Sequence, residues 1–250
     1  MKANYHTHTR WCRHGSGEIE DFVCEAIKKG LDTLAVTEHV PYRSNFDSRR
    51  MQWEEFFAYN QELEAVIQKY EGRLHIIKGF ECEYNPAVME DYQRFREEYG
   101  YDLMILGQHL STDHQLDYFA PKGEKEFSRY TDEVLCGLET GFFTFLAHPE
   151  VALNGYQGSA DFAESQIRRI FEACERLRIP VEINANGLRG NRAYPDWSVW
   201  VLSKEYRLKR LINSDAHSVP DLCDEAGVLA AEKRCAALGI PVTERLTDIG

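Results

Sequence analysis

The chain has 250 residues, of which 43% are hydrophobic and 28% are charged, as in an ordinary folded protein with a sizeable core. These proportions exclude a disordered tail, a collagen and a small disulfide scaffold. The chain has 29 Lys and Arg against 41 Asp and Glu, so its formal net charge is −12. With this excess of negative charge, we do not expect extended nucleic acid as a partner. The length suits one α/β barrel and no linker divides the chain, so we predict one domain over residues 1–250.

The sequence carries no recognisable targeting or membrane signal. Its first residues run into His6-Thr7-His8 without the basic and apolar regions of a secretory signal. The longest apolar run, at 142–147, is far shorter than the ~18 residues of a membrane span. Seven scattered cysteines without a C-x-x-C pair are typical of reduced thiols, so we expect a cytoplasmic protein with no membrane partner. The sequence indicates no oligomeric state.

The hydrophobic pattern predicts short strands that alternate with amphipathic helices. From the N-terminus we predict a strand that ends at 5–8, a helix at 18–29 stopped by Gly30, a strand at 31–37, a helix at 53–72, a strand at 74–80, a helix at 90–99 and a strand at 103–107. Beyond these we predict a helix at 124–138, a strand at 142–147, a helix capped by Ser159 that reaches 177, strands at 180–184 and 211–213, and a helix at 221–238 with Pro220 in its first turn.

This alternation is typical of an α/β fold with parallel strands covered by helices. About seven such units favour a closed or nearly closed barrel, and an open doubly wound sheet is the alternative. Neither a G-x-G-x-x-G nor a G-x-x-x-x-G-K-[ST] motif follows any predicted strand, so a nucleotide-binding fingerprint is absent from the sequence.

Polar residues follow almost every predicted strand. In a parallel barrel these carboxyl ends meet at one rim, where active sites are built. Seven of the nine histidines lie at or just past a strand end, namely His6, His8, His14, His39, His109, His148 and His217. His75 and His114 do not fit this pattern, and we interpret both as ordinary surface or hydrogen-bonded histidines.

The spacing of these residues points to metal ions. His6 and His8 share one face of an extended strand, as do Asp215 and His217, so two side chains of one segment can reach one ion. Imidazoles mixed with carboxylates suit Zn, Mn or Fe better than Mg or Ca. The residues outnumber the four ligands of one tetrahedral zinc, which indicates two or three ions.

Together the motifs resemble the PHP (polymerase and histidinol phosphatase) superfamily, in its order along the chain. The segments that carry the resemblance are His6-x-His8, Cys12-Arg13-His14-Gly15, Thr37-Glu38-His39, Gly79-Phe80-Glu81, His109, Ala147-His148-Pro149 and Asp215-Ala216-His217. The resemblance implies a distorted (β/α)7 TIM-like barrel with a trinuclear metal centre of divalent transition-metal ions (Zn, Mn or Fe) at the carboxyl ends of the strands.

The resemblance also implies a ligand set. A first ion would take His6, His8, Glu81 and Asp215. A second would share Glu81 as a bridging carboxylate and add His109 and His148. A third would take His14, His39 and His217. Glu83 competes with Glu81 for the bridging position, and the Gly-Phe-Glu context favours Glu81. Among these residues we predict catalytic roles for Glu81, Asp215 and His217, and the general acid for the leaving group stays open.

Within the superfamily, the segments 37–41, 78–84 and 182–189 resemble the histidinol-phosphatase branch. In that branch the arginine of the N-x-x-G-L-R stretch binds the substrate phosphate, and Arg189 matches it. Arg192 is a second candidate for phosphate binding, or else a solvated loop arginine. A guanidinium suits this task because its planar fork meets phosphate oxygens in pairs.

The resemblance therefore predicts a metal-dependent phosphomonoesterase for a small phosphate ester. The favoured reaction is the hydrolysis of L-histidinol phosphate to L-histidinol and phosphate by a metal-activated hydroxide. One alternative is a phosphoesterase of the same superfamily that acts on a small nucleotide, another phosphate monoester or phosphotyrosine. A second is a metal-binding module without catalysis. A weaker one is an amidohydrolase-type enzyme, which would not need Arg189.

Overall fold

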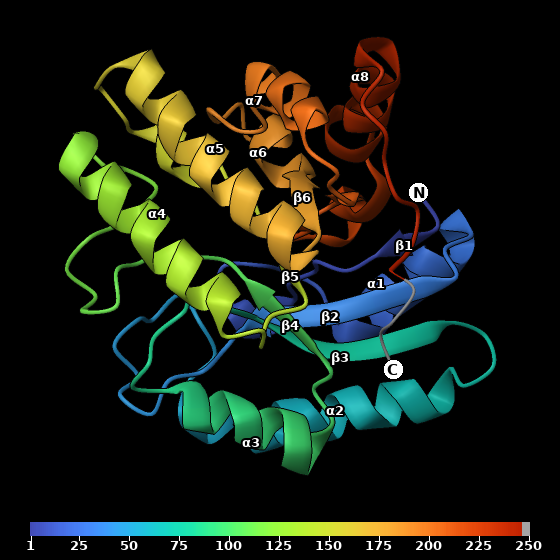
Figure 1. The fold of residues 1–250 in the computed structure, drawn as a ribbon. Helices are drawn as coiled ribbons and strands as arrows, with labels where there is room; N and C mark the ends of the chain where they lie inside the picture. The colour runs from blue at the N-terminus through green and yellow to red at the C-terminus, as the bar shows by residue number, and fades with distance from the viewer. Residues whose placement is uncertain (247–250) are drawn as a thin grey trace.

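The computed structural model describes residues 1–246 and contains one sheet of seven parallel strands (Figure 1). The strands are β1 (Ala3–Asn4), β2 (Thr33–His39), β3 (His75–Cys82), β4 (Leu103–Leu106), β5 (Phe145–Leu146), β6 (Val181–Asn184) and β7 (Arg210–Asn213). Each strand pairs with the next in chain order. The two ends of the sheet meet where Thr7 forms a parallel bridge with Ala216, whose carbonyl accepts the His8 N–H at 2.8 Å. The sheet thus curls into a nearly closed barrel, as predicted.

Helices cover the outside of this barrel. They are α1 (Ile19–Lys29), α2 (Phe56–Lys69), α3 (Met89–Tyr99), α4 (Glu124–Glu139), α5 (Ala160–Leu177), α6 (Ala185–Arg189), α7 (Trp197–Leu202) and α8 (Ala230–Leu238). Figure 1 shows α4 and α5 packed side by side on the outside of the sheet, while α2 and α3 lie along β3. Within residues 1–246, no helix combines the length and the apolarity that crossing a membrane requires.

Several predicted element ends are confirmed by their caps. The α1 helix buries Ile19, Phe22, Val23 and Ala26 and stops at Gly30, whose φ of 74° is the left-handed conformation that glycine adopts without strain. Ser159 caps α5, because its side chain accepts the Phe162 N–H at 3.0 Å.

The C-terminal part departs from prediction. The single helix expected at 221–238 is wrong: a 3₁₀ turn at Val219–Cys223 holds Pro220, a π-helical turn follows at Glu225–Leu229, and only then does α8 begin. Asp224 causes the break, since its carboxylate accepts the N–H groups of Gly227 and Val228 and starts a new helix. The strand expected at 142–147 shrinks to β5, and α6 and α7 were not predicted.

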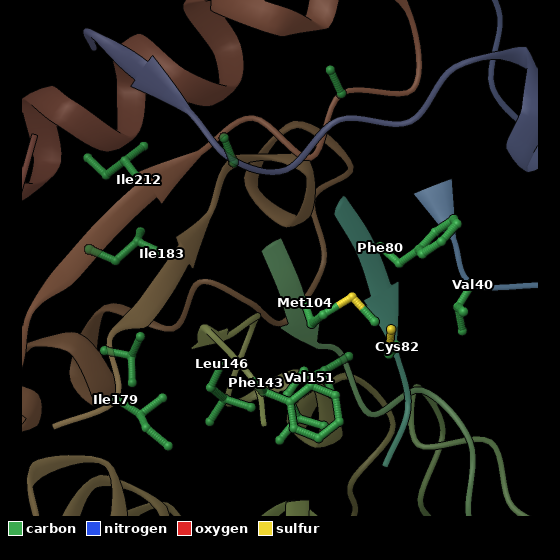
Figure 2. Close-up of a cluster of buried hydrophobic side chains, with 14 of the residues drawn as sticks. Val40, Phe80, Cys82, Met104, Phe143, Leu146, Val151, Ile179, Ile183 and Ile212 are labelled. Carbon is green, nitrogen blue, oxygen red and sulfur yellow. The ribbon is translucent and has the colours of Figure 1, made fainter. Parts of the chain in front are cut away.

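Alternate residues of the strands belong to two different apolar clusters. Met104 and Leu106 of β4 belong to a large cluster shared with the helices, so they face outward, whereas Leu103 and Ile105 belong to a smaller one that fills the barrel. Figure 2 shows part of the large cluster, with Phe80, Cys82, Met104, Leu146, Ile183 and Ile212 labelled among its members. The inward row of each strand therefore runs up through the barrel toward the rim.

Candidate metal centre

Glu81 stands at the centre of the rim. It continues the inward row of β3 from Ile77, and its carboxylate is buried. Its oxygens lie 3.0–3.3 Å from ring nitrogens of five histidines, namely His6, His8, His39, His109 and His148. Gly107, just past β4, makes this approach possible, because a Cβ at that position would overlap Glu81 Oε1.

The four residues predicted to hold a first ion lie together. Asp215 Oδ1 is 3.6 Å from His6 Nε2 and 3.3 Å from His8 Nε2, and all four side chains are buried. His6 and His8 follow β1, Glu81 lies in β3 and Asp215 follows β7. The meeting of the first and last strands is what brings this group into contact.

The residues predicted for a second ion are also assembled. His109 Nε2 and His148 Nε2 lie 3.2 Å apart, and both approach Glu81 Oε1, at 3.2 and 3.0 Å. His148 has a φ of 28°, an unusual backbone conformation for a non-glycine residue, and Asp215 has a φ of 43°. Such strained positions concentrate at functional sites, where the surrounding structure holds them.

The third predicted group is looser. His14 Nε2 lies 2.9 Å from His217 Nε2, while the His39 ring is centred 5.4 Å from the His14 ring and 6.5 Å from the His217 ring. His39 also turns Nδ1 toward Glu81 Oε2 at 3.1 Å, so it stands between the predicted groups. The thiol of Cys12 lies near His14 and His217, although we assigned it no ligand role.

The donor atoms fit divalent transition metals. Among residues 1–246, four buried polar atoms of the cluster have no hydrogen-bond partner: His6 Nε2, His8 Nε2, His39 Nδ1 and Asp215 Oδ1. Leaving buried polar atoms unpaired is unfavourable, and a bound cation would satisfy such a cluster. Imidazole nitrogens and carboxylate oxygens are the ligands that Zn, Mn and Fe take in proteins.

Glu182 contacts His6 and was not assigned a role from the sequence. Its Oε1 lies 2.8 Å from His6 Nδ1 and also accepts Asn213 Nδ2 at 3.0 Å. Its Oε2 accepts Asn184 Nδ2 at 2.9 Å and the His148 N–H at 3.3 Å. A carboxylate behind a metal-binding histidine fixes the ring and its tautomer. The signal available in the sequence was only its inward position on a strand.

Two asparagines orient Asp215 in the same way. Asn184 Nδ2 and Asn186 Nδ2 donate to Asp215 Oδ2 at 3.0 and 3.1 Å. The other oxygen, Oδ1, is thereby left to face His6 and His8.

Glu83, the alternative to Glu81, points elsewhere. Arg50 donates to both of its oxygens, at 3.0 and 3.2 Å, and Tyr42 Oη donates to Oε2 at 2.8 Å. Its Oε1 lies 3.1 Å from His109 Nδ1. Burial favours the neutral acid, but Arg50 and His109 hold the pKa of Glu83 well below its usual value. The geometry therefore favours Glu81 as the central carboxylate.

The carboxylates shift the histidine pKa values. Burial lowers the pKa of His8 and His109, yet the neighbouring carboxylates, Glu81 among them, raise the pKa to about 8 and about 10 respectively. Burial, together with the charge of His8, lowers the pKa of His217 to about 3. Burial would raise the pKa of Glu81, but the surrounding histidines hold it well below its usual value. Metal binding at this cluster must therefore displace protons.

A cavity of about 570 Å³ opens above the cluster. Its lining includes Glu81 and Asp215 together with Arg49, Arg50, Asp117, Phe119 and Arg192. Of these, Arg49, Arg50, Asp117 and Phe119 were not predicted from the sequence. The volume lies within the range of small-molecule sites.

Arg189 and Arg192 have different surroundings. The Arg189 side chain is hydrogen-bonded to two acidic residues. It donates to both carboxylate oxygens of Asp224 at 3.0 Å and to the backbone carbonyl of Asp221 at 2.9 Å. It is not among the residues that line the cavity, so the geometry gives no support to the prediction that it binds substrate phosphate. Arg192 does line the cavity, with its guanidinium 5.5 Å from the Phe119 ring centre.

Comparison with known proteins agrees with this geometry. The PHP domain family matches residues 4–186. Histidinol-phosphatase of Bacillus subtilis is 25% identical over 259 aligned positions, which cover 89% of this chain and 96% of that protein. A probable histidinol-phosphatase of Deinococcus radiodurans is 30% identical over 105 residues, which span 42% of this chain and only 40% of that protein.

A solved structure shares the fold. It is a histidinol phosphate phosphatase from Lactococcus lactis complexed with zinc, L-histidinol and phosphate, and it superposes with a TM-score of 0.77 at 17% identity, over 100% of this chain and 98% of that one. The match to the family covers well over half of the present chain and includes most of the clustered histidines. The chain therefore belongs to the PHP domain family, in its histidinol-phosphatase branch, and is a metal-dependent phosphoesterase.

Proposed function

We propose that this protein is a phosphomonoesterase that hydrolyses L-histidinol phosphate to L-histidinol and phosphate. The observation that carries the proposal is the cluster of unpaired histidine and carboxylate atoms at the floor of a cavity of small-molecule size. The substrate comes from the relatives, because the similar Bacillus protein is a histidinol-phosphatase and the Lactococcus structure holds L-histidinol and phosphate.

In this proposal the three ligand groups hold divalent ions. His6, His8, Glu81 and Asp215 hold one, Glu81, His109 and His148 a second, and His14, His39 and His217 a third. Bound there, the ions would supply Lewis acidity for the phosphate and lower the pKa of a water molecule toward 7. Glu182, Asn184 and Asn186 hold the ligand side chains in position, so that these side chains need little reorganisation during the reaction.

Arg192 is the arginine that we propose for the substrate phosphate. One of its N–H groups donates to Tyr194 Oη at 2.6 Å, and its guanidinium lies over Phe119. These contacts hold the side chain at the cavity and leave further donors free for phosphate oxygens. Asp117, at the same cavity, offers a carboxylate for the ammonium group of an amino alcohol.

The test is phosphate release by metal-loaded protein from L-histidinol phosphate, beside p-nitrophenyl phosphate, phosphotyrosine and a set of nucleotides. We expect kcat/KM of ~10⁴ M⁻¹s⁻¹ or more on L-histidinol phosphate alone. Glu81→Gln serves as the control, because the amide loses the charge shared by the first two ions and should abolish most turnover. Equally slow release from every ester would refute the assigned substrate, and no release with ions bound would refute catalysis.

A further inference from the structure

Arg50 is a buried cation outside the ligand set. It lies in the segment between β2 and α2 and is only 4% exposed. Its guanidinium meets both oxygens of Glu83 and also donates to the Val40 carbonyl at 3.3 Å. A charge that is buried this deeply persists only where it is paired, so Arg50 and Glu83 depend on each other.

The ion pair leads directly to His109. Glu83 Oε1, which Arg50 holds from one side, lies 3.1 Å from His109 Nδ1. With Nδ1 used as the donor to Glu83, Nε2 is the ring nitrogen left to bind an ion, and it faces Glu81 and His148. Donation from the second ring nitrogen to a carboxylate fixes the tautomer and the direction of a metal-binding histidine.

Arg50 also keeps Glu83 out of the ligand set. Oε2 is occupied by Arg50 and Tyr42, and Oε1 by Arg50 and His109. Without the guanidinium, Glu83 would be an uncompensated buried carboxylate close to several metal ligands, and free to compete with Glu81.

We propose that Arg50 is a positioning residue, which acts through Glu83 to aim His109 at the ion it shares with Glu81 and His148. The inference rests on the proposed metal centre. It assigns a role to a residue that also lines the cavity but makes no direct contact with a predicted ligand atom.

The experiment measures metal binding rather than turnover. Wild-type protein, Arg50→Gln, Glu83→Gln and the double variant are stripped of metal and titrated with Zn²⁺ in a metal buffer, and bound zinc is counted at each free concentration. Unfolding of each metal-free protein is followed in parallel. Arg43→Gln is the matched control, because Arg43 lies in the same segment but is exposed and paired with Asp91 at the surface.

We expect Arg50→Gln to weaken the binding of one zinc ion by about 10- to 100-fold. At a zinc concentration that saturates the wild type, the variant should therefore bind one ion fewer. Arg43→Gln should bind as the wild type does. The double variant removes both buried charges, so it should recover folding stability. Its affinity for the weakly bound ion should stay low. This variant also keeps the test available where Arg50→Gln alone does not fold.

Two results would overturn the inference. Unchanged zinc binding by Arg50→Gln would show that His109 is aimed without Arg50. Recovery of zinc affinity together with stability in the double variant would show that the pair serves folding alone. Failure of the wild type to bind zinc is a different outcome, since it would refute the proposed metal centre and this inference with it.

Discussion

Gly107 shows how little room the centre leaves at the residue scale. Any side chain there would meet the Glu81 carboxylate, whose oxygens lie 3.3 Å from His8 and 3.0 Å from His148. We expect Gly107→Ala to displace Glu81, with a loss of more than tenfold in kcat and weaker binding of two ions. Gly123→Ala is the control, because a Cβ there meets no described atom within 4 Å. Full activity of Gly107→Ala with normal metal content would contradict the central role of Glu81.

Glu150 makes stability depend on pH. Its Oε1 accepts Trp200 Nε1 at 2.6 Å, its Oε2 has no partner in the described part of the chain, and burial raises its pKa from 4.5 to about 8. A carboxyl group whose folded pKa is raised stabilises the fold fully below pH 4.5 and loses that contribution as the pH rises through about 8. The loss is on the order of 4 kcal/mol over this range.

Glu150→Gln should remove this loss, because the amide is neutral and can still accept from Trp200. Urea unfolding at pH 5, 6, 7 and 8 would show a flatter stability profile for the variant and a gain over the wild type at pH 8. Parallel profiles for the two proteins would mean that Glu150 is ionised in the fold.

Residues that bind and residues that orient differ in how well a sequence reveals them. The rim histidines could be predicted, because a ligand must follow a strand and its chemistry limits it to a few residue types. Glu182 and Glu83 could not, since any inward carboxylate has the same local pattern, whether it holds a histidine, an ion or an arginine. Arg189 is a different case, because the family motif marks the residue while its surroundings depend on Asp224, 35 residues later, which accepts from its Nε and Nη2.

At the scale of elements, the α5 cap offers a measurable contribution. Ser159→Ala removes the acceptor for the Phe162 N–H and should lower the free energy of unfolding by about 1 kcal/mol. Ser165→Ala, an exposed site inside the same helix whose hydroxyl donates only to the Phe162 carbonyl of its own helix, should change stability little, because alanine is the better helix former. Denaturant unfolding of both variants checks this, and an equal change in the two would refute the capping role.

Long elements were predictable and short ones were not. The α1 and α5 helices carry apolar residues at helical spacing over three turns or more and end at recognisable caps. The α6 and α7 helices have five and six residues, too few for a period to show. The break before α8 depends on Asp224, whose carboxylate caps the turn at Glu225–Leu229. The residues next to it in the sequence do not predict this cap.

At the scale of the whole molecule, metal should act as a stabilising ligand. A ligand bound only by the folded state adds about 2.7 kcal/mol at 100 times its dissociation constant. We expect EDTA to lower the melting temperature of zinc-loaded protein at pH 8. The shift should shrink as the pH falls from 8 to 6, because protons compete for His8 and His109, whose pKa values are raised. A chelator shift that is the same at both pH values would contradict this competition.

The seam between the first and last strands has a consequence for how the chain is held together. Contacts across it, such as the Tyr5 N–H with Asn213 Oδ1, join positions 208 apart in sequence, and the first ligand group draws on both sides of it. An ion there would act as a removable cross-link between the two ends of the fold. A permanent link over such a loop restricts the unfolded chain by on the order of 5 kcal/mol. Loading the centre would thus stabilise the closed barrel, and stripping it would remove this cross-link between its two ends.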